Sequence, residues 1–98
     1  MYLKVEIMPF VREDGGKEHG DSICVNLDHV LYIAKGYLSL HLYFQYVDSV
    51  DFTLQTNDVV DELFDMICSF MWGTVRGEFV MSDKKGAVVA KISQMDKA

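Results

Sequence analysis

The residue types that most often carry chemistry are few in this chain, and their spacing matches no common catalytic or metal-binding motif. The three histidines, His19, His29 and His41, do not lie four residues from a second ligand, as they would in a helical zinc motif. No serine stands in a GxSxG elbow, and the glycines do not form a phosphate-binding loop between a strand and a helix. His41 alternates with Leu40 and Leu42, which predicts a surface or interface histidine and not a base. We therefore expect no catalytic, cofactor-binding or metal-binding residue, and no enzyme.

One polar segment, residues 12–21, combines a histidine with carboxylates that could coordinate a hard cation. Its candidate ligands are Glu13, Asp14, Glu18, His19 and Asp21. The alternating Asp and Asn ligands of an EF-hand loop are missing. Glycines without any large apolar residue are typical of a solvated loop, and we interpret the segment in that way.

The two cysteines, Cys24 and Cys68, lie far apart and lack the CxxC spacing of a zinc finger or redox pair. A cysteine without such a partner behaves mostly as a small core hydrophobe. We expect both to be buried, reduced thiols that are dispensable for function. The first residues alternate apolar and polar side chains, and no apolar stretch approaches the roughly 18 residues of a membrane span. A cytoplasmic protein that does not bind membranes is expected.

Charge is distributed unevenly along the chain, whose formal net charge is −6. No Lys or Arg occurs between Lys35 and Arg76. That stretch contains Asp48, Asp51, Asp58, Asp61, Glu62 and Asp65. Proteins that bind nucleic acid directly usually present a basic stripe. The sequence therefore predicts no direct contact with nucleic acid.

Alternating apolar residues predict several strands. The segment Leu3–Val11 has this period. Because proline donates no ladder hydrogen bond, Pro9 predicts that this strand lies at a sheet edge or frays at that residue. Residues 23–26 and 30–33 are β segments around a bulge, a turn or a short helical turn. Residues 38–46 and 50–55 alternate in register and are separated by a short connection, which predicts an antiparallel hairpin. A second hairpin is expected from residues 78–81 and 87–92.

The period changes to that of a helix near Asn57, and the carboxylates that follow suit the first turn. The predicted fold class is α+β. One domain, residues 1–98, has an antiparallel sheet of four to six strands packed on one amphipathic helix, about Asp58–Trp72. The two apolar faces should form one cluster of Leu42, Phe44, Leu63, Phe64 and Ile67.

Two features exceed what a core needs, and together they give the candidate partner-binding residues. The first is a helix row of carboxylates without Lys or Arg at helical spacing, with further carboxylates on the preceding hairpin. The second is tyrosine on the polar side of that hairpin. The residues are Asp48, Asp51, Asp58, Asp61, Glu62, Asp65, Tyr37 and Tyr43. Two plainer alternatives are a solvated helix face, and a sheet face covered by the second hairpin or the N-terminal strand.

Two family resemblances follow from these residues. The run Ile23-Cys24-Val25-Asn26 to Ile33, then a hairpin, then a capped acidic helix, resembles small β-rich proteins of the flagellar FlbD type. The size, the acidity and a hairpin running into an acidic helix over residues 52–72 resemble small anti-CRISPR and other anti-defence proteins of phages. The second resemblance implies inhibition by occupying a basic, nucleic-acid-binding surface.

The function expected from the sequence is that of a non-enzymatic acidic binding module. Its partner would be a protein with a basic surface, which a phage-type inhibitor could occupy. One alternative is a small structural protein that acts as a homo-oligomer, with a homodimer expected somewhat more often than a monomer. Another is a small ligand-binding domain or enzyme with a site built from loop residues.

Overall fold

The computed structural model describes residues 1–45 and 48–95. Most of these residues lie in strands or helices, as the small number of proline residues in the sequence suggests. In chain order the elements are β1 (Tyr2–Ile7), β2 (Phe10–Val11), β3 (Lys17–Glu18), β4 (Asp21–Asn26), η1 (Leu27–His29), β5 (Val30–Gly36), β6 (Ser39–Phe44), β7 (Val50–Thr53), α1 (Asn57–Met71), β8 (Glu78–Ser82) and β9 (Val88–Met95).

The strands form two main sheets, both antiparallel. The first has the order β4-β1-β9-β8, and the second has the order β5-β6-β7. A small ribbon of β2 and β3 extends from one end. The chain passes from the first sheet to the second through the 3₁₀ turn η1, whose first amide groups are capped by Asn26. The α+β class and a four-stranded antiparallel sheet are confirmed, while three strands that could have joined that sheet form one of their own.

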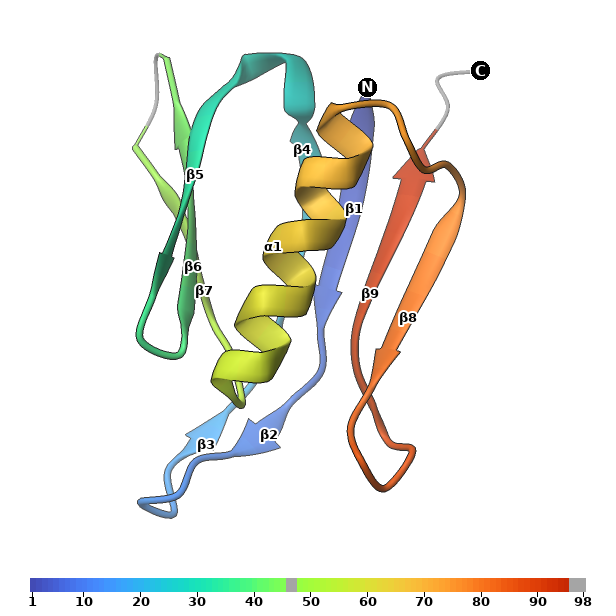
Figure 1. The fold of residues 1–98 in the computed structure, drawn as a ribbon. Helices are drawn as coiled ribbons and strands as arrows, with labels where there is room; N and C mark the ends of the chain where they lie inside the picture. The colour runs from blue at the N-terminus through green and yellow to red at the C-terminus, as the bar shows by residue number, and fades with distance from the viewer. Residues whose placement is uncertain (46–47, 96–98) are drawn as a thin grey trace.

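Helix α1 lies between the two main sheets in the view of Figure 1. Its buried residues include Val60, Leu63 and Ile67. They belong to one core cluster with residues of both sheets, among them Leu3 of β1 and Leu42 of β6. One helix therefore closes the apolar faces of both sheets. The predicted cluster of hairpin and helix residues is confirmed, with Phe44 and Phe64 half-buried at its margin.

The helix ends are set by local sequence. Thr56 has an extended backbone, and its hydroxyl accepts a hydrogen bond from the amide of Val59 at 3.2 Å. At the other end Gly73 adopts a positive φ of 75°. Its amide donates to Phe70, and the amide of Thr74 donates to Ser69, which together make a Schellman motif. The helix is thus one residue earlier at each end than the sequence predicted.

Two expectations about single residues are wrong. The strand β1 is not an edge strand, because it pairs with β4 on one side and β9 on the other, and Pro9 follows its end. Cys24 is exposed, and Cys68 is only partly buried. In β4 the alternation turns Val25 into the core and Cys24 to the opposite, open face of the sheet.

Candidate functional site

The helix carboxylates form one exposed row along α1. Asp58, Asp61, Glu62 and Asp65 are all exposed. They recur at intervals of three and four residues, so they share one side of the helix. Val60, Leu63 and Ile67 are buried on the other side. The row is therefore available to a partner.

A basic residue from β5 reaches this row, although the sequence around the helix offers none. The ammonium of Lys35 lies 3.1 Å from the Asp61 carboxylate. The same ammonium lies 4.9 Å from the centre of the Phe64 ring. Within residues 1–45 and 48–95, this is the one ion pair formed by the row. Self-repulsion among the carboxylates is thus relieved at one position of four.

An apolar groove runs beside the row, between β5 and the second half of α1. It has a volume of about 330 Å³ and is lined by Ile33, Phe64, Cys68, Met71 and Trp72. Trp72 is 83% exposed, the largest exposed fraction among the large apolar residues described. Burial raises the pKa of the Cys68 thiol, which keeps it protonated and apolar. An exposed tryptophan over an apolar groove is typical of an interaction surface.

The open face of the β5-β6-β7 sheet carries the predicted Tyr43. Its ring stacks on that of Tyr32, with ring centres 4.4 Å apart. Tyr32 is 56% exposed, so the stack faces solvent. The second hairpin and the N-terminal strand β1 both belong to the other sheet, which lies on the far side of α1 in Figure 1, so the alternative in which either covers this face is wrong.

On the same face three polar side chains form a hydrogen-bonded chain. His41 on β6 lies opposite Asp51 on β7 in the strand register. Its Nδ1 is 2.6 Å from the Asp51 carboxylate, and its Nε2 is 3.0 Å from the Ser39 hydroxyl. An ionised carboxylate can only accept, so Nδ1 carries the proton; in neutral His41, Nε2 accepts from Ser39. The hydrogen bond from His41 holds the pKa of Asp51 below its usual value.

This Ser-His-Asp order is that of a nucleophilic triad, but its setting differs from that of a catalytic one. The acid of a catalytic triad is buried beside its histidine. Here the Asp51 side chain is 57% exposed, so solvent screens its charge. We interpret the chain as a cross-strand link that fixes the register of β6 and β7.

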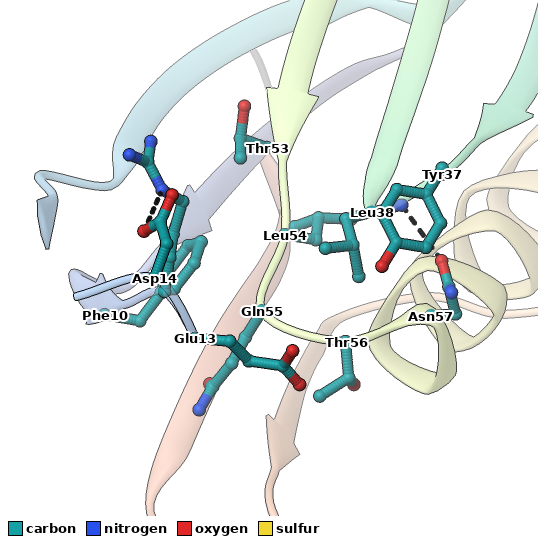
Figure 2. Close-up of a pocket in the computed structure, with 11 residues that line it drawn as sticks. Phe10, Glu13, Asp14, Tyr37, Leu38, Thr53, Leu54, Gln55, Thr56 and Asn57 are labelled. Carbon is teal, nitrogen blue, oxygen red and sulfur yellow. Dashed lines mark hydrogen bonds and ion pairs between the residues drawn. The ribbon is translucent and has the colours of Figure 1, made fainter. Parts of the chain in front are cut away.

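Tyr37 lies at the turn between β5 and β6, beside a second cavity of about 390 Å³ at the start of α1. Figure 2 shows Tyr37 and Leu38 next to Asn57, with the loop of Glu13 and Asp14 on the other side. Leu38 has a positive φ of 51°, unusual for a residue with a side chain. Its amide donates to the Asn57 side chain at 2.9 Å, which holds the turn in place. Tyr37 itself is 81% exposed.

The eight predicted partner-binding residues therefore do not form one surface. Asp58, Asp61, Glu62 and Asp65 line α1, on one side of the β5-β6-β7 sheet. Tyr43 and Asp51 lie on the opposite face of that sheet. Asp48 is exposed before β7, and Tyr37 stands at the turn. The apolar groove was not predicted, although exposed Met71 and Trp72 at the helix end were a usable signal.

Comparison of the chain with protein-family models, with curated proteins and with solved structures found no match. The resemblances to anti-defence proteins and to FlbD-type proteins therefore stay predictions. Of the chain that the structure describes, no helix has the length and hydrophobicity needed to cross a membrane. Nor do the described His, Cys, Asp and Glu residues gather anywhere in a group of three suited to a metal ion.

Proposed function

We propose that this protein is a non-catalytic binding module that docks the acidic row of α1 on a basic surface of another protein. That basic surface would otherwise bind nucleic acid. By occupying it, the module would act as an inhibitor of the kind that phages encode. It would do so in the cytoplasm, where its two unpaired thiols are stable.

The observation that supports this proposal best is the exposed row, which has a single counter-charge among the residues that the structure describes. Asp58, Glu62 and Asp65 are exposed, and Lys35 reaches only Asp61. Like charges three and four residues apart repel by a few tenths of a kcal/mol per pair. A basic partner would remove this repulsion on binding. This repulsion is small enough that the free protein remains folded without a partner.

The dimensions of the row support the kind of partner. From Asp58 to Asp65 a helix rises about 11 Å, at roughly 1.5 Å per residue. A groove that holds duplex nucleic acid meets a charge about every 1.7 Å along the axis. Four carboxylates over that length can therefore take the place of several phosphates. Complementary charge of this kind acts mainly on association rate and specificity.

The test is a zero-length carbodiimide cross-link in a lysate of the source cells, read by mass spectrometry. This reagent joins carboxylates to lysine amines in direct contact. We expect cross-links from Asp61, Glu62 or Asp65 to lysines of one partner. Added nucleic acid should compete with them, and higher salt should weaken them, because the contact is between exposed charges.

Two triple variants, which change the net charge by three units in opposite directions, provide the test and its control. The first is Asp61→Asn with Glu62→Gln and Asp65→Asn, and the second replaces Lys84, Lys85 and Lys91 by Gln. We expect the first variant to bind the partner at least about tenfold more weakly through a slower association rate, and the second to bind normally. Circular dichroism confirms that both are folded. Normal binding by the first and loss by the second would show that the β8-β9 hairpin is the working surface.

A further inference from the structure

We infer that the open edge of β5 binds an extended segment of the partner as an additional strand, in which the side chains turned toward α1 are apolar and basic in turn. The inference deepens the proposed function, on which it rests, by naming the place and the chemistry of the contact. The strand supplies the backbone contact, the groove takes the apolar side chains, and the row takes the basic ones.

The first step is that β5 ends its sheet. In the order β5-β6-β7 it pairs with β6 on one side only. In an antiparallel ladder, every second residue of an edge strand turns its amide and carbonyl groups away from its neighbour. None of the backbone hydrogen bonds described outside the ladders comes from residues 31–35. Another strand can therefore pair with this edge.

The second step is that the groove lies where the side chains of such a strand would fall. Ile33 and Lys35 point to the helix side of β5, since Ile33 lines the groove and Lys35 reaches Asp61. A strand added beside them would place every second side chain on that same side. Cys68, Met71 and Trp72 line the groove together with Ile33, so side chains that enter it would meet them.

The third step is the charge beside the groove, which selects the occupant. At 100° per residue, Asp61 and Asp65 lie within about 60° of Cys68 and on either side of Trp72 around α1. Both carboxylates are exposed, and one of them already holds the ammonium of Lys35. A bound segment with Lys or Arg two residues away from an apolar residue would turn both side chains to this side and meet this charge. A second copy of this chain fits less well, because each copy carries a net charge of −6.

The experiment uses the full chain and three synthetic nine-residue peptides with blocked ends. In the first, Leu and Arg alternate at the odd-numbered positions, with Ser at the even-numbered positions. The second has Glu in place of Arg, and the third is the Leu-Arg peptide with every second amide N-methylated. The sequence has a single tryptophan, so the fluorescence of Trp72 reports occupation of the groove directly. Amide exchange followed by NMR reports pairing at β5.

We expect the Leu-Arg peptide to bind at least about tenfold more tightly than the Leu-Glu peptide, with a blue shift of Trp72 emission. Alternate β5 amides should become protected from exchange. N-methylation should abolish binding, because it removes the hydrogen-bond donors of the added strand as proline would. Met71→Lys should weaken binding about tenfold, since it places a positive charge in the groove. The matched control is Val80→Lys, at an exposed position on the other sheet, which should leave peptide binding unchanged.

Equal binding of the basic and acidic peptides, unprotected β5 amides, or tight binding of the N-methylated peptide would each overturn the inference. So would protection of β5 that depends on protein concentration alone, since that would identify a second copy as the occupant. The two proposals fail separately. If the acidic-row variant loses the partner, but the partner does not protect the β5 amides of the parent protein, the proposed function stands and the strand-addition inference is wrong. If the peptide pairs with β5, but the partner binds the acidic-row variant as tightly as the parent, the strand-addition inference stands and the proposed function is wrong.

Discussion

Strand register brings together side chains whose contact cannot be predicted from single residues, as it does for Ser39, His41 and Asp51. Alternation in the sequence predicted that His41 and Asp51 lie on the polar side of one hairpin. It did not predict that they stand directly opposite, because that depends on how many residues the connection between β6 and β7 takes up. Lys35 was missed for a similar reason. Its partner Asp61 is far away in sequence, and only tertiary packing brings the two together.

The link between His41 and Asp51 makes stability depend on pH. The pKa of Asp51 is lowered in the folded protein by this hydrogen bond. Stability from this carboxylate is therefore present above its unfolded pKa and is lost as the pH falls through its folded pKa. We expect Asp51→Asn to lower the midpoint of urea unfolding at neutral pH and to differ less from the parent in acid.

The control for this prediction is Glu13→Gln, which removes one negative charge from an exposed turn outside the sheet. It should leave the midpoint almost unchanged at both pH values. A difference between parent and Asp51→Asn that grows as the pH falls would contradict the sign of the effect.

Ser39 is expected to react as an ordinary serine despite its hydrogen bond to His41. The Asp51 side chain is 57% exposed, whereas the acid of a catalytic triad is buried beside its histidine, so solvent screens the charge that would assist catalysis. Incubation with a fluorophosphonate probe, followed by peptide mass spectrometry, should find Ser39 unmodified. Labelling that His41→Ala removes would establish a nucleophilic site and revive the enzymatic alternative.

At the scale of elements, the helix and the two hairpins followed from the sequence because their signals are local. A 3.6-residue period between a Thr cap and a Gly terminator defines α1 to within one residue. The strand β1 was harder, because one proline suggested an edge. Pro9 lies beyond Ile7, the last residue of the strand, so it costs no ladder hydrogen bond. A single proline is therefore weaker evidence of where a strand lies in its sheet than the burial of its side chains. In β1, Leu3, Val5 and Ile7 are all buried.

Two phenylalanines on facing elements should differ in what they contribute to stability. Phe52 of β7 is 1% exposed, whereas Phe64 of α1 is half-buried beside the groove. Phe52→Ala should lower the free energy of unfolding by roughly 3–5 kcal/mol, the range for a fully buried ring. Phe64→Ala should lower it less, because water already reaches one side. Chemical denaturation of both variants measures the difference, and an equal or larger loss at Phe64 would contradict the packing described.

At the scale of the whole molecule, the sequence predicted the fold class but not the division of strands between two sheets. That division depends on η1, where residues 27–29 fit a bulge, a turn or a helical turn equally well. It depends also on the pairing of β1 with β9, whose partners lie at opposite ends of the sequence. Such long-range pairing leaves no periodic signal. The groove could not be predicted from the sequence for the same reason, because it forms only where β5 packs beside α1.

Association of the chain with itself should respond to salt in the opposite direction from association with a basic partner. Copies with a net charge of −6 repel one another, and salt screens that repulsion. Any homodimer formed through apolar surface should therefore strengthen as salt rises, while the complex with a basic partner weakens. Light scattering at micromolar concentration across a salt series measures the first trend. Dimerisation that weakens with salt would point to contacts between opposite charges of two copies.

The central position of β1 has a consequence for synthesis on the ribosome. The ladder that places Tyr2 beside Met95 cannot form until nearly the whole sequence has left the exit tunnel. Until then the nascent chain can complete its local hairpins and α1, but β1 has only β4 beside it. The groups that β9 will later cover stay open to other chains during that interval. A nascent chain arrested before β9 therefore presents an unpaired edge along β1.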